Sequence, residues 1–546
     1  MALSGLGTDP HMTLPDPSTL FGAIVGSDAW PVLRVGLQVA FFTTVVYIFK
    51  LGINVRGLVM LRPSGRPKRS FGVAFFVLAL LFFCVLLYQA TWQLTGLFRP
   101  QFLAFMQAYD RRQFNPAHRI RRGRILDHSG AMLAFSKRRG DQVLRLYPYG
   151  PAFAHAVGYS DPKFGASGME AAANAHLNGA VADSLPAWGE LGRQLLTREE
   201  SPRGQDLRLT LDAELQLLAI QRLGDKGGAV VALEPRDGAI RVLASTPAFD
   251  PNHITADLFR PGDLGTPLLN RATQGLYPPG STFKILTAAL ALSKGFKGRL
   301  HCPADGYATS AHYRKIRDHE YYVARRQGRI WPGYGRLDLA TALAKSSNVF
   351  FARLGVGYGS VAFARNLERF HFNRPIDLYR SPSGSWAMRT GRVPEIAKAD
   401  RYGLAQASIG QGKTLVTPAH MALIVAAVAN RGLAMQPRLV ATDPPARLAR
   451  FLSEQSAWQL AGMLRKAVTE GTGRGIRVAQ PTIAGKTGTA QTPWGVAHSW
   501  FVGFAPARRP GLAVAVIVEH GGYGAAAAAP IARDLLVRAH ELGMLP

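Results

Sequence analysis

Three short motifs in one fixed order contain the side chains of this 546-residue chain that are best suited to chemistry. Residues 281–284 read Ser-Thr-Phe-Lys, residues 346–348 read Ser-Ser-Asn, and residues 486–489 read Lys-Thr-Gly-Thr. Together they supply a serine nucleophile, a lysine that can take its proton, a second hydroxyl, an amide and a further cation. These groups suit a serine acyltransferase in which lysine replaces histidine as the base.

The first motif is expected at the start of a buried helix. Residues 277–280, Tyr-Pro-Pro-Gly, form a turn before Ser281, and the apolar run 285–292 that follows is hydrophobic nearly all round. Lys284 then lies one turn from Ser281 on the same face. Burial and the helix dipole both lower the pKa of such a lysine, so that Lys284 can be neutral and act as the base. The alternative is a capping serine beside a solvent-facing lysine.

The middle motif precedes a second apolar run, Val349 to Phe351. Ser346 is predicted to relay a proton, and Asn348 to donate a hydrogen bond to a substrate amide. Serine and asparagine are also common helix caps, which is the simpler alternative.

The third motif is expected on a strand, where a glycine usually marks a close approach by ligand or backbone. An extended substrate can add along this edge, with its carboxylate attracted to Lys486. The N–H groups of Thr489 and Ser281 would form an oxyanion hole. The substrate-binding residues predicted on this edge are Thr487, Gly488 and Thr489.

The surrounding elements predict an α+β domain. Five strands are expected, at 228–233, 239–244, 482–491, 498–504 and 512–519. The insertion at about 250–478 is expected to be mostly helical, and a last helix is expected at 526–542. Two early and three late strands then form one antiparallel sheet, packed against a helical lobe with a cleft between them.

Residues 1–98 form a predicted membrane region with two spans, at about 32–51 and 71–97. The basic cluster at 62–69 lies between the spans and is expected in the cytoplasm, which leaves the N-terminus and the bulk of the chain outside it. The alternative for the first stretch is a helix on the membrane surface. Residues 99–226 are predicted to form a small, turn-rich domain, and residues 227–546 the catalytic domain.

The formal net charge of +29 indicates a basic surface for anionic lipid or an anionic polymer. No nucleic-acid-binding motif accompanies the scattered arginines, so no nucleic-acid partner is expected. Neither a structural disulfide nor a cofactor or metal is predicted. One polar cluster matches no standard zinc spacing and is expected to consist of surface residues: His301, Cys302, Asp305, His312, Asp318, His319 and Glu320.

The motif set resembles that of class B penicillin-binding proteins, which are peptidoglycan D,D-transpeptidases. The resemblance covers nearly everything after Arg99. Residues 122–127, Arg-Gly-Arg-Ile-Leu-Asp, and residues 168–170, Gly-Met-Glu, resemble the family's pedestal (dimerisation-type) domain. Residues 408–412, 471–473 and 500–504 resemble the catalytic domain, which implies the penicillin-binding transpeptidase fold.

The resemblance implies that Ser281 is the nucleophile, Lys284 the base and Lys486 part of the catalytic strand edge. Ser281 would be acylated by the penultimate D-Ala of a stem peptide, and a neighbouring stem's amine would then attack, forming a cross-link. β-Lactams would trap the acyl-enzyme. The expected setting is the bacterial inner membrane, with the catalytic domain in the periplasm. The expected partner is a multi-pass glycan polymerase of the shape, elongation, division and sporulation family.

The chain departs from the family pattern in its short pedestal and its second span. Leu343 and Ala344 stand where some relatives have a metal-binding cysteine. Two other functions stay open: a membrane-bound β-lactam sensor, and a catalytically silent cell-wall scaffold.

Overall fold

The structure is a computed structural model that describes residues 121–139, 142–179, 204–260, 265–492 and 495–546, with four isolated positions at 78, 81, 82 and 85. The chain divides into two compact units, Met1–Pro100 and Gln101–Pro546, and all five described ranges belong to the second. The two predicted spans lie outside these ranges. No helix among the described residues is long and apolar enough to cross a membrane.

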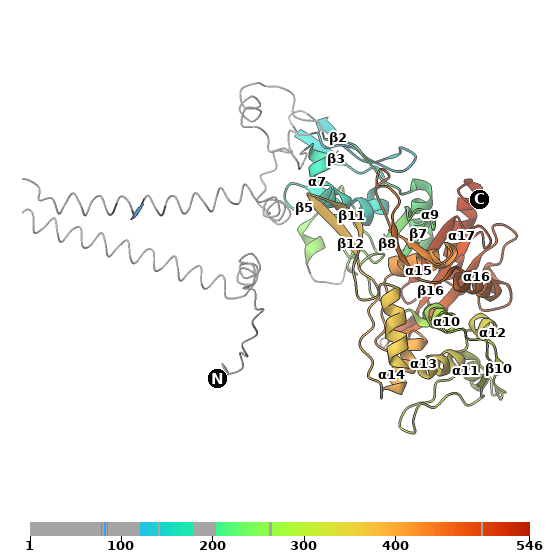
Figure 1. Ribbon diagram of the computed structural model, residues 1–546. Coiled ribbons are helices and arrows are strands. Elements are labelled where there is room, and N and C mark those ends of the chain that lie inside the picture. The colour runs from blue at the N-terminus through green and yellow to red at the C-terminus, as the bar shows by residue number, and fades with distance from the viewer. Residues whose placement is uncertain are drawn as a thin grey trace, which may run out of the picture. The chain divides into compact units, whose positions relative to one another are not determined.

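A five-stranded antiparallel sheet forms the centre of the second unit (Figure 1). Its strands, in spatial order, are β15 (Ala484–Thr492), β16 (Gly495–Ala505), β17 (Leu512–Val518), β7 (Gly228–Leu233) and β8 (Ile240–Thr246). The early and late strands meet where β17 pairs with β7, for example at Val514 and Ala232. The predicted sheet is confirmed, and only the strand ends differ from the expected positions.

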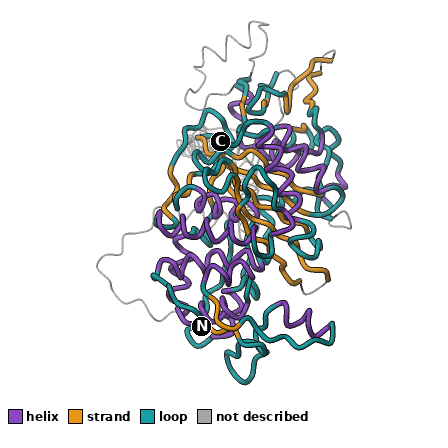
Figure 2. The backbone as a smooth tube through the Cα atoms, turned by 90° about the vertical axis from the view of Figure 1, so that its right-hand side faces the viewer, coloured by secondary structure: helices purple, strands orange, loops and turns teal. Residues whose placement is uncertain are grey.

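Helices lie on both sides of this sheet (Figure 2). α9 (Ala213–Leu223) and α17 (Ala528–Glu541) share one apolar core with one face of the sheet. α15 (Pro418–Ala429) packs on the other face, against β16, β17 and β7. Pro418 to Val428 are all buried, which explains why the sequence of α15 is apolar on every side.

The segment between β8 and β15 forms the helical lobe. Its helical elements are η3 (Ala256–Phe259), η4 (Gly280–Phe283), α10 (Lys284–Ser293), α11 (His319–Arg326), α12 (Leu339–Lys345), α13 (Asn348–Arg369), α14 (Arg401–Ser408), α15, α16 (Glu454–Thr469) and η5 (Arg474–Ile476). The lobe also contains three strand pairs: β9 (Leu300–Cys302) with β10 (Gly335–Leu337), β11 (Ile376–Ser381) with β12 (Gly384–Met388), and β13 (Leu433–Met435) with β14 (Arg447–Arg450). The sequence did not predict these pairs, because most of these strands are too short to display an alternating pattern.

A smaller region precedes the central sheet. Its four-stranded sheet has the order β3-β2-β1-β6, with strands β1 (Ile125–Leu126), β2 (Met132–Arg139), β3 (Gln142–Leu146) and β6 (Leu207–Arg208). Around it lie η2 (Gly150–Phe153), α5 (Ala154–Val157), the strand pair β4 (Ser160–Asp161) and β5 (Gly165–Ala166), α6 (Gly168–Ala172) and α7 (Asn174–Asn178).

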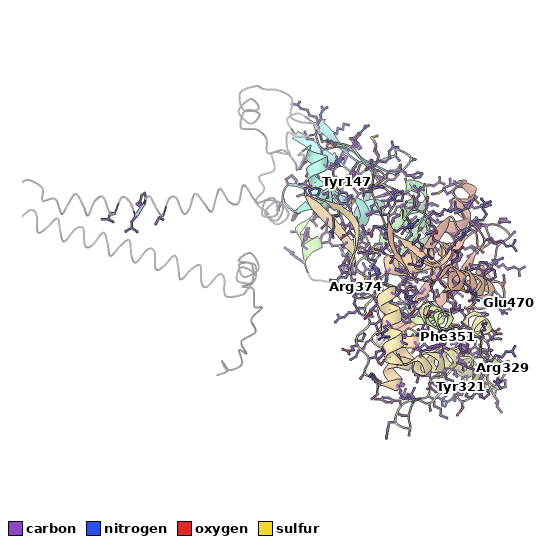
Figure 3. The ribbon with its side chains drawn as sticks, in the orientation of Figure 1. Tyr147, Tyr321, Arg329, Phe351, Arg374 and Glu470 are labelled. Atoms are coloured by element: carbon purple, nitrogen blue, oxygen red, sulfur yellow. The ribbon has the colours of Figure 1, made fainter. Side chains whose placement is uncertain are left out.

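The core of this region contains a buried ion cluster. Glu170 is fully buried and accepts from Arg122 Nη2 at 2.7 Å and from Arg145 Nε at 2.6 Å. Tyr147, labelled in Figure 3, donates to Glu170 Oε1 at 3.3 Å. Burial alone would raise the pKa of Glu170, but the two guanidinium groups outweigh it and hold the pKa below its ordinary value. Arg122 and Glu170, which carry the pedestal resemblance, therefore hold this region together.

Candidate active site

Ser281 lies on η4, a short 3₁₀ turn that leads directly into α10. The sequence placed Ser281 at the start of an α-helix; the structure begins that helix at Lys284 instead. Gly280 has a φ of +53°, and a Cβ atom in its place would lie 2.5 Å from the backbone oxygen of Thr489. Glycine therefore allows the nucleophile turn to lie against β15.

Lys284 is fully buried beside Ser281. Its Nζ lies 3.0 Å from Ser281 Oγ and 3.3 Å from Ser346 Oγ. It donates to the backbone oxygen of Ser346 at 2.6 Å and to Asn348 Oδ1 at 2.7 Å. The structure thus brings the first and middle motifs together around one amine.

Burial lowers the pKa of Lys284 from its ordinary 10.5 to about 7. The carboxylates of Asp318 and Glu320 oppose this shift and raise the pKa. A substantial fraction of Lys284 is therefore neutral at neutral pH, as the sequence predicted for a buried lysine.

The middle motif connects two helices. Ser346 ends α12 in the left-handed conformation, with a φ of +60°. Ser347 caps α13, since its Oγ accepts from the N–H of Phe350 at 3.1 Å. The simpler reading, a helix cap, is thus correct for Ser347, while Ser346 and Asn348 on either side both contact Lys284.

The third motif lies on β15, an edge strand of the central sheet. A Cβ atom at Gly488 would lie 2.8 Å from Thr282 Cγ2 and 3.0 Å from the backbone oxygen of Pro279. The close approach predicted from this glycine is the approach of the nucleophile turn. Trp500 on β16 fixes the same turn, because its Nε1 donates to the oxygen of Pro278 at 3.0 Å.

Lys486 is 1% exposed. Its Nζ donates to the backbone oxygen of Thr487 at 2.9 Å and to Thr472 Oγ1 at 3.3 Å. Burial lowers its pKa well below the ordinary value, and the charge of Lys284 lowers it further. The charge of Lys284 therefore acts on the lysine of the third motif.

The sequence missed two residues that hold the site. From the sequence, Thr472 is noted only as part of the family-like segment 471–473, and Asp318 is expected at the surface. That expectation is wrong for Asp318 and Cys302, which are 2% and 0% exposed. Asp318 Oδ1 accepts from Ser347 Oγ at 2.9 Å, so it supports the middle motif directly. Within the described residues, no group of three or more His, Cys, Asp or Glu side chains could hold a metal ion.

Fold and site together have the arrangement of a serine acyltransferase, with a buried lysine amine 3.0 Å from the serine hydroxyl. Residues 228–537 match the penicillin binding protein transpeptidase domain, and residues 122–205 match the penicillin binding protein A dimerisation domain. The chain therefore belongs to the penicillin-binding protein transpeptidase family, and the resemblance inferred from the three motifs is confirmed.

Curated relatives match most of the chain. It is 32% identical over 458 residues to the peptidoglycan D,D-transpeptidase PbpA of Mycolicibacterium smegmatis. This alignment covers 76% of this chain and 88% of the relative. It is 30% identical to the peptidoglycan D,D-transpeptidase MrdA of Acinetobacter baumannii, covering 71% of this chain and 65% of that one.

Solved structures of other transpeptidases have a fold similar to that of this chain. Penicillin-binding protein A from M. tuberculosis, as a ceftriaxone acyl-enzyme complex, has a TM-score of 0.66 and 29% identity, over 78% of this chain and 99% of that chain. The D,D-transpeptidase domain of a peptidoglycan glycosyltransferase from Eggerthella lenta has a TM-score of 0.65 and 30% identity, over 78% of this chain and 99% of that chain.

Proposed function

We propose that this protein is a peptidoglycan D,D-transpeptidase that cross-links stem peptides through an acyl-enzyme on Ser281. One observation carries the proposal: the bonding of the Lys284 amine. A neutral amine has two N–H groups and one lone pair. Ser346 O and Asn348 Oδ1 accept two N–H bonds at 2.6 and 2.7 Å, so the lone pair is free for the hydroxyl of Ser281 at 3.0 Å. This is the arrangement that a general base requires.

In the proposed acylation, Ser281 Oγ attacks the carbonyl carbon of the penultimate D-Ala while Lys284 takes its proton. The N–H groups of Ser281 and Thr489 stabilise the oxyanion. Collapse of the tetrahedral intermediate breaks the amide bond, and the departing terminal D-Ala receives the proton by way of Ser346. An amine of a second stem peptide then attacks the ester, Lys284 accepts the amine's proton, and Ser281 leaves with a proton.

The outer edge of β15, where no other described strand pairs, is the proposed peptide-binding surface. The donor stem would pair with Thr487 to Thr489 as an added strand, and Asn348 would donate to a substrate amide. Lys486 would attract the substrate carboxylate. The family supports β-lactams as a second class of ligand, since the M. tuberculosis relative is described as a ceftriaxone acyl-enzyme complex.

The test is intact-mass spectrometry of the protein after incubation with penicillin. A stoichiometric, long-lived penicilloyl adduct is expected, and it should be absent in Ser281→Ala. Ser293→Ala is a matched control at the far end of α10 and should retain the adduct. An adduct that persists in Ser281→Ala, or rapid turnover of the drug, would contradict the assignment. Release of D-Ala with formation of cross-linked peptide then separates transpeptidation from simple hydrolysis.

We also propose the domain boundaries 1–98, 99–226 and 227–546, with membrane spans at about 32–51 and 71–97 and the catalytic domain in the periplasm. The support is the charge pattern, in which a basic cluster lies between two apolar stretches. A cysteine at Ser18 should react with a membrane-impermeant maleimide in intact spheroplasts, whereas a cysteine at Ser64 should not. Protection at both positions would indicate a single span, with the first stretch on the membrane surface.

A multi-pass glycan polymerase of the shape, elongation, division and sporulation family is the proposed partner. The support is the family to which the chain belongs. Purification in mild detergent should recover such a polymerase with the wild-type chain. Repeated failure to recover one, across growth conditions, would argue against the partnership.

A further inference from the structure

Asp318 is a buried carboxylate that the three motifs leave unexplained. It immediately precedes α11 and is 2% exposed. An aspartate at this position usually caps its own helix, but Asp318 makes no such bond to α11. Its side chain instead contacts the chain around the middle motif, from which it is separated by about thirty residues of sequence.

Two hydrogen bonds join Asp318 to the start of α13. Its Oδ1 accepts from Ser347 Oγ at 2.9 Å and from the N–H of Val349 at 3.1 Å. The preceding residue adds a third bond, because the backbone oxygen of Arg317 accepts from Asn348 Nδ2 at 2.9 Å. The segment before α11 therefore fixes Ser347 and the amide plane of Asn348.

That amide plane matters because its other end faces the reacting lysine. Asn348 Oδ1 accepts from Lys284 Nζ at 2.7 Å. Turning the amide around would place an NH₂ group against the amine and remove this acceptor. Arg317 and Asp318 thus determine which atoms of the middle motif Lys284 meets.

We propose that Asp318 is a positioning residue for the acylation of Ser281, which holds the middle motif in the shape that bonds Lys284 and places one buried negative charge near that lysine. The inference rests on the proposed function and adds to it a residue outside the three motifs.

The second carboxylate oxygen indicates that Asp318 contributes a negative charge and not only hydrogen bonds to α13. Asp318 Oδ2 is buried and has no hydrogen-bond partner within the described residues. Burial raises the pKa of Asp318 above its ordinary value, which is the cost of holding a carboxylate here. A neutral asparagine would make the same two bonds through its oxygen without burying a charge. The position at the start of α13 favours a negative charge, because the positive end of the helix dipole lies there and the N–H of Val349 donates to the carboxylate. What the aspartate adds is its charge.

The charged groups that face Lys284 come from two elements. Asp318 and Glu320, beside and on α11, raise its pKa. Lys486 on β15 is the nearby basic group, and the charge of Lys284 lowers the pKa of Lys486. Without Asp318, burial would be opposed by Glu320 alone, and the pKa of Lys284 would fall further below its ordinary value. A lysine with so low a pKa is a weak proton acceptor, and a base works best when its pKa is near the operating pH.

The test is the pH profile of acylation by a fluorescent penicillin in Asp318→Asn. This variant keeps an oxygen for Ser347 and Val349 but removes the charge. The acid limb of the profile should move to lower pH by about half a unit or more. Asp305→Asn, on a side chain that is 65% exposed in the same lobe, should leave the limb in place. An unmoved limb in Asp318→Asn overturns the proposal, even if the plateau rate falls.

A second measurement does not depend on acylation. In protein labelled with ¹³C at the lysine ε-carbon, the Lys284 resonance is assigned by its loss in Lys284→Arg and is titrated in the unacylated protein. Its midpoint should fall in Asp318→Asn and return toward the wild-type value in Asp318→Glu. An equal midpoint in wild type and Asp318→Asn overturns the inference. A wild type that titrates near pH 7 but forms no adduct would overturn the proposed function alone.

Discussion

The hydroxyl oxygens of Thr472 and Thr487 lie 2.7 Å apart, although one follows α16 and the other lies on β15. Lys486 Nζ donates to Thr472 Oγ1 at 3.3 Å and to the backbone oxygen of Thr487 at 2.9 Å. The turn after α16 therefore fixes the lysine of the third motif. Lys486→Arg retains a cation and its donors and should keep more acylation activity than Lys486→Ala. Equal rates in the two variants would contradict a role for the charge.

Lys284→Arg should nearly abolish acylation. Arginine keeps the positive charge but does not lose its proton in proteins, so it cannot serve as the base. The rate of penicillin acylation should fall by about a thousandfold or more. Lys294→Arg, on an exposed lysine at the end of α10, is the matched control and should be unaffected. Near-normal acylation in Lys284→Arg would rule out the lysine-base mechanism.

The rate of acylation should depend on pH with a midpoint near 7. Lys284 is active when neutral, and burial lowers its pKa to about 7, so activity should be lost as the pH falls below that value. Labelling with fluorescent penicillin for fixed times, between pH 5.5 and 9, measures how the acylation rate falls toward acid pH. If the limb instead lies near the ordinary lysine pKa of 10.5, Lys284 is not held as the structure indicates.

Gly280→Ala should separate the nucleophile turn from β15. The added Cβ would lie 2.5 Å from the oxygen of Thr489, and a displacement of Ser281 by about 1 Å can cost about a hundredfold in rate. Gly295→Ala is the control, since Gly295 has a similar φ of +69° but open space around it. That variant should lose about 1 kcal/mol of stability and keep its acylation rate. Similar rates in both variants would mean that the contact with Thr489 is unimportant.

Acid should destabilise the fold partly through His420. This fully buried histidine accepts from the N–H of Gly391 at 2.8 Å, and burial lowers its pKa from 6.5 to about 4. The unfolded chain binds the proton more readily between these values, so stability falls as the pH drops from 6.5 to 4. The loss is about 3 kcal/mol. His155, with a pKa lowered to about 4 by burial, acts in the same direction.

Chemical denaturation at several pH values checks this expectation. In His420→Gln the free energy of unfolding should vary less with pH between 6.5 and 4. His253→Gln, on a side chain that is 81% exposed, should leave the wild-type slope unchanged. A slope in His420→Gln as steep as that of the wild type would be inconsistent with a buried neutral histidine.

Local patterns in the sequence were enough to predict the strands of the central sheet and the buried helix that follows Ser281. β7 and β8 are apolar and flank a Pro-Arg-Asp-Gly turn, and α10 is apolar on all sides. Asp318 could not be predicted, because its burial depends on contacts with Ser347 and Val349 across the lobe. Its own segment is polar and resembles an ordinary surface helix start. The contact of Thr472 with Lys486 could not be predicted either, because only the folded chain brings these two residues together.

The outer edge of β15, which pairs with no other strand in the described part of the chain, affects how readily the domain aggregates. Unpaired sheet edges invite other chains to pair with them, and proteins usually block such edges. An enzyme that binds a peptide along an edge cannot block it. Here the first five residues of β15, Ala484 to Gly488, are buried, and only the strand's later part reaches the surface. Most of β15 is therefore covered by the rest of the domain, which leaves little of its edge for another folded sheet to pair with. The same burial that surrounds the third motif would thus also protect the domain from aggregation.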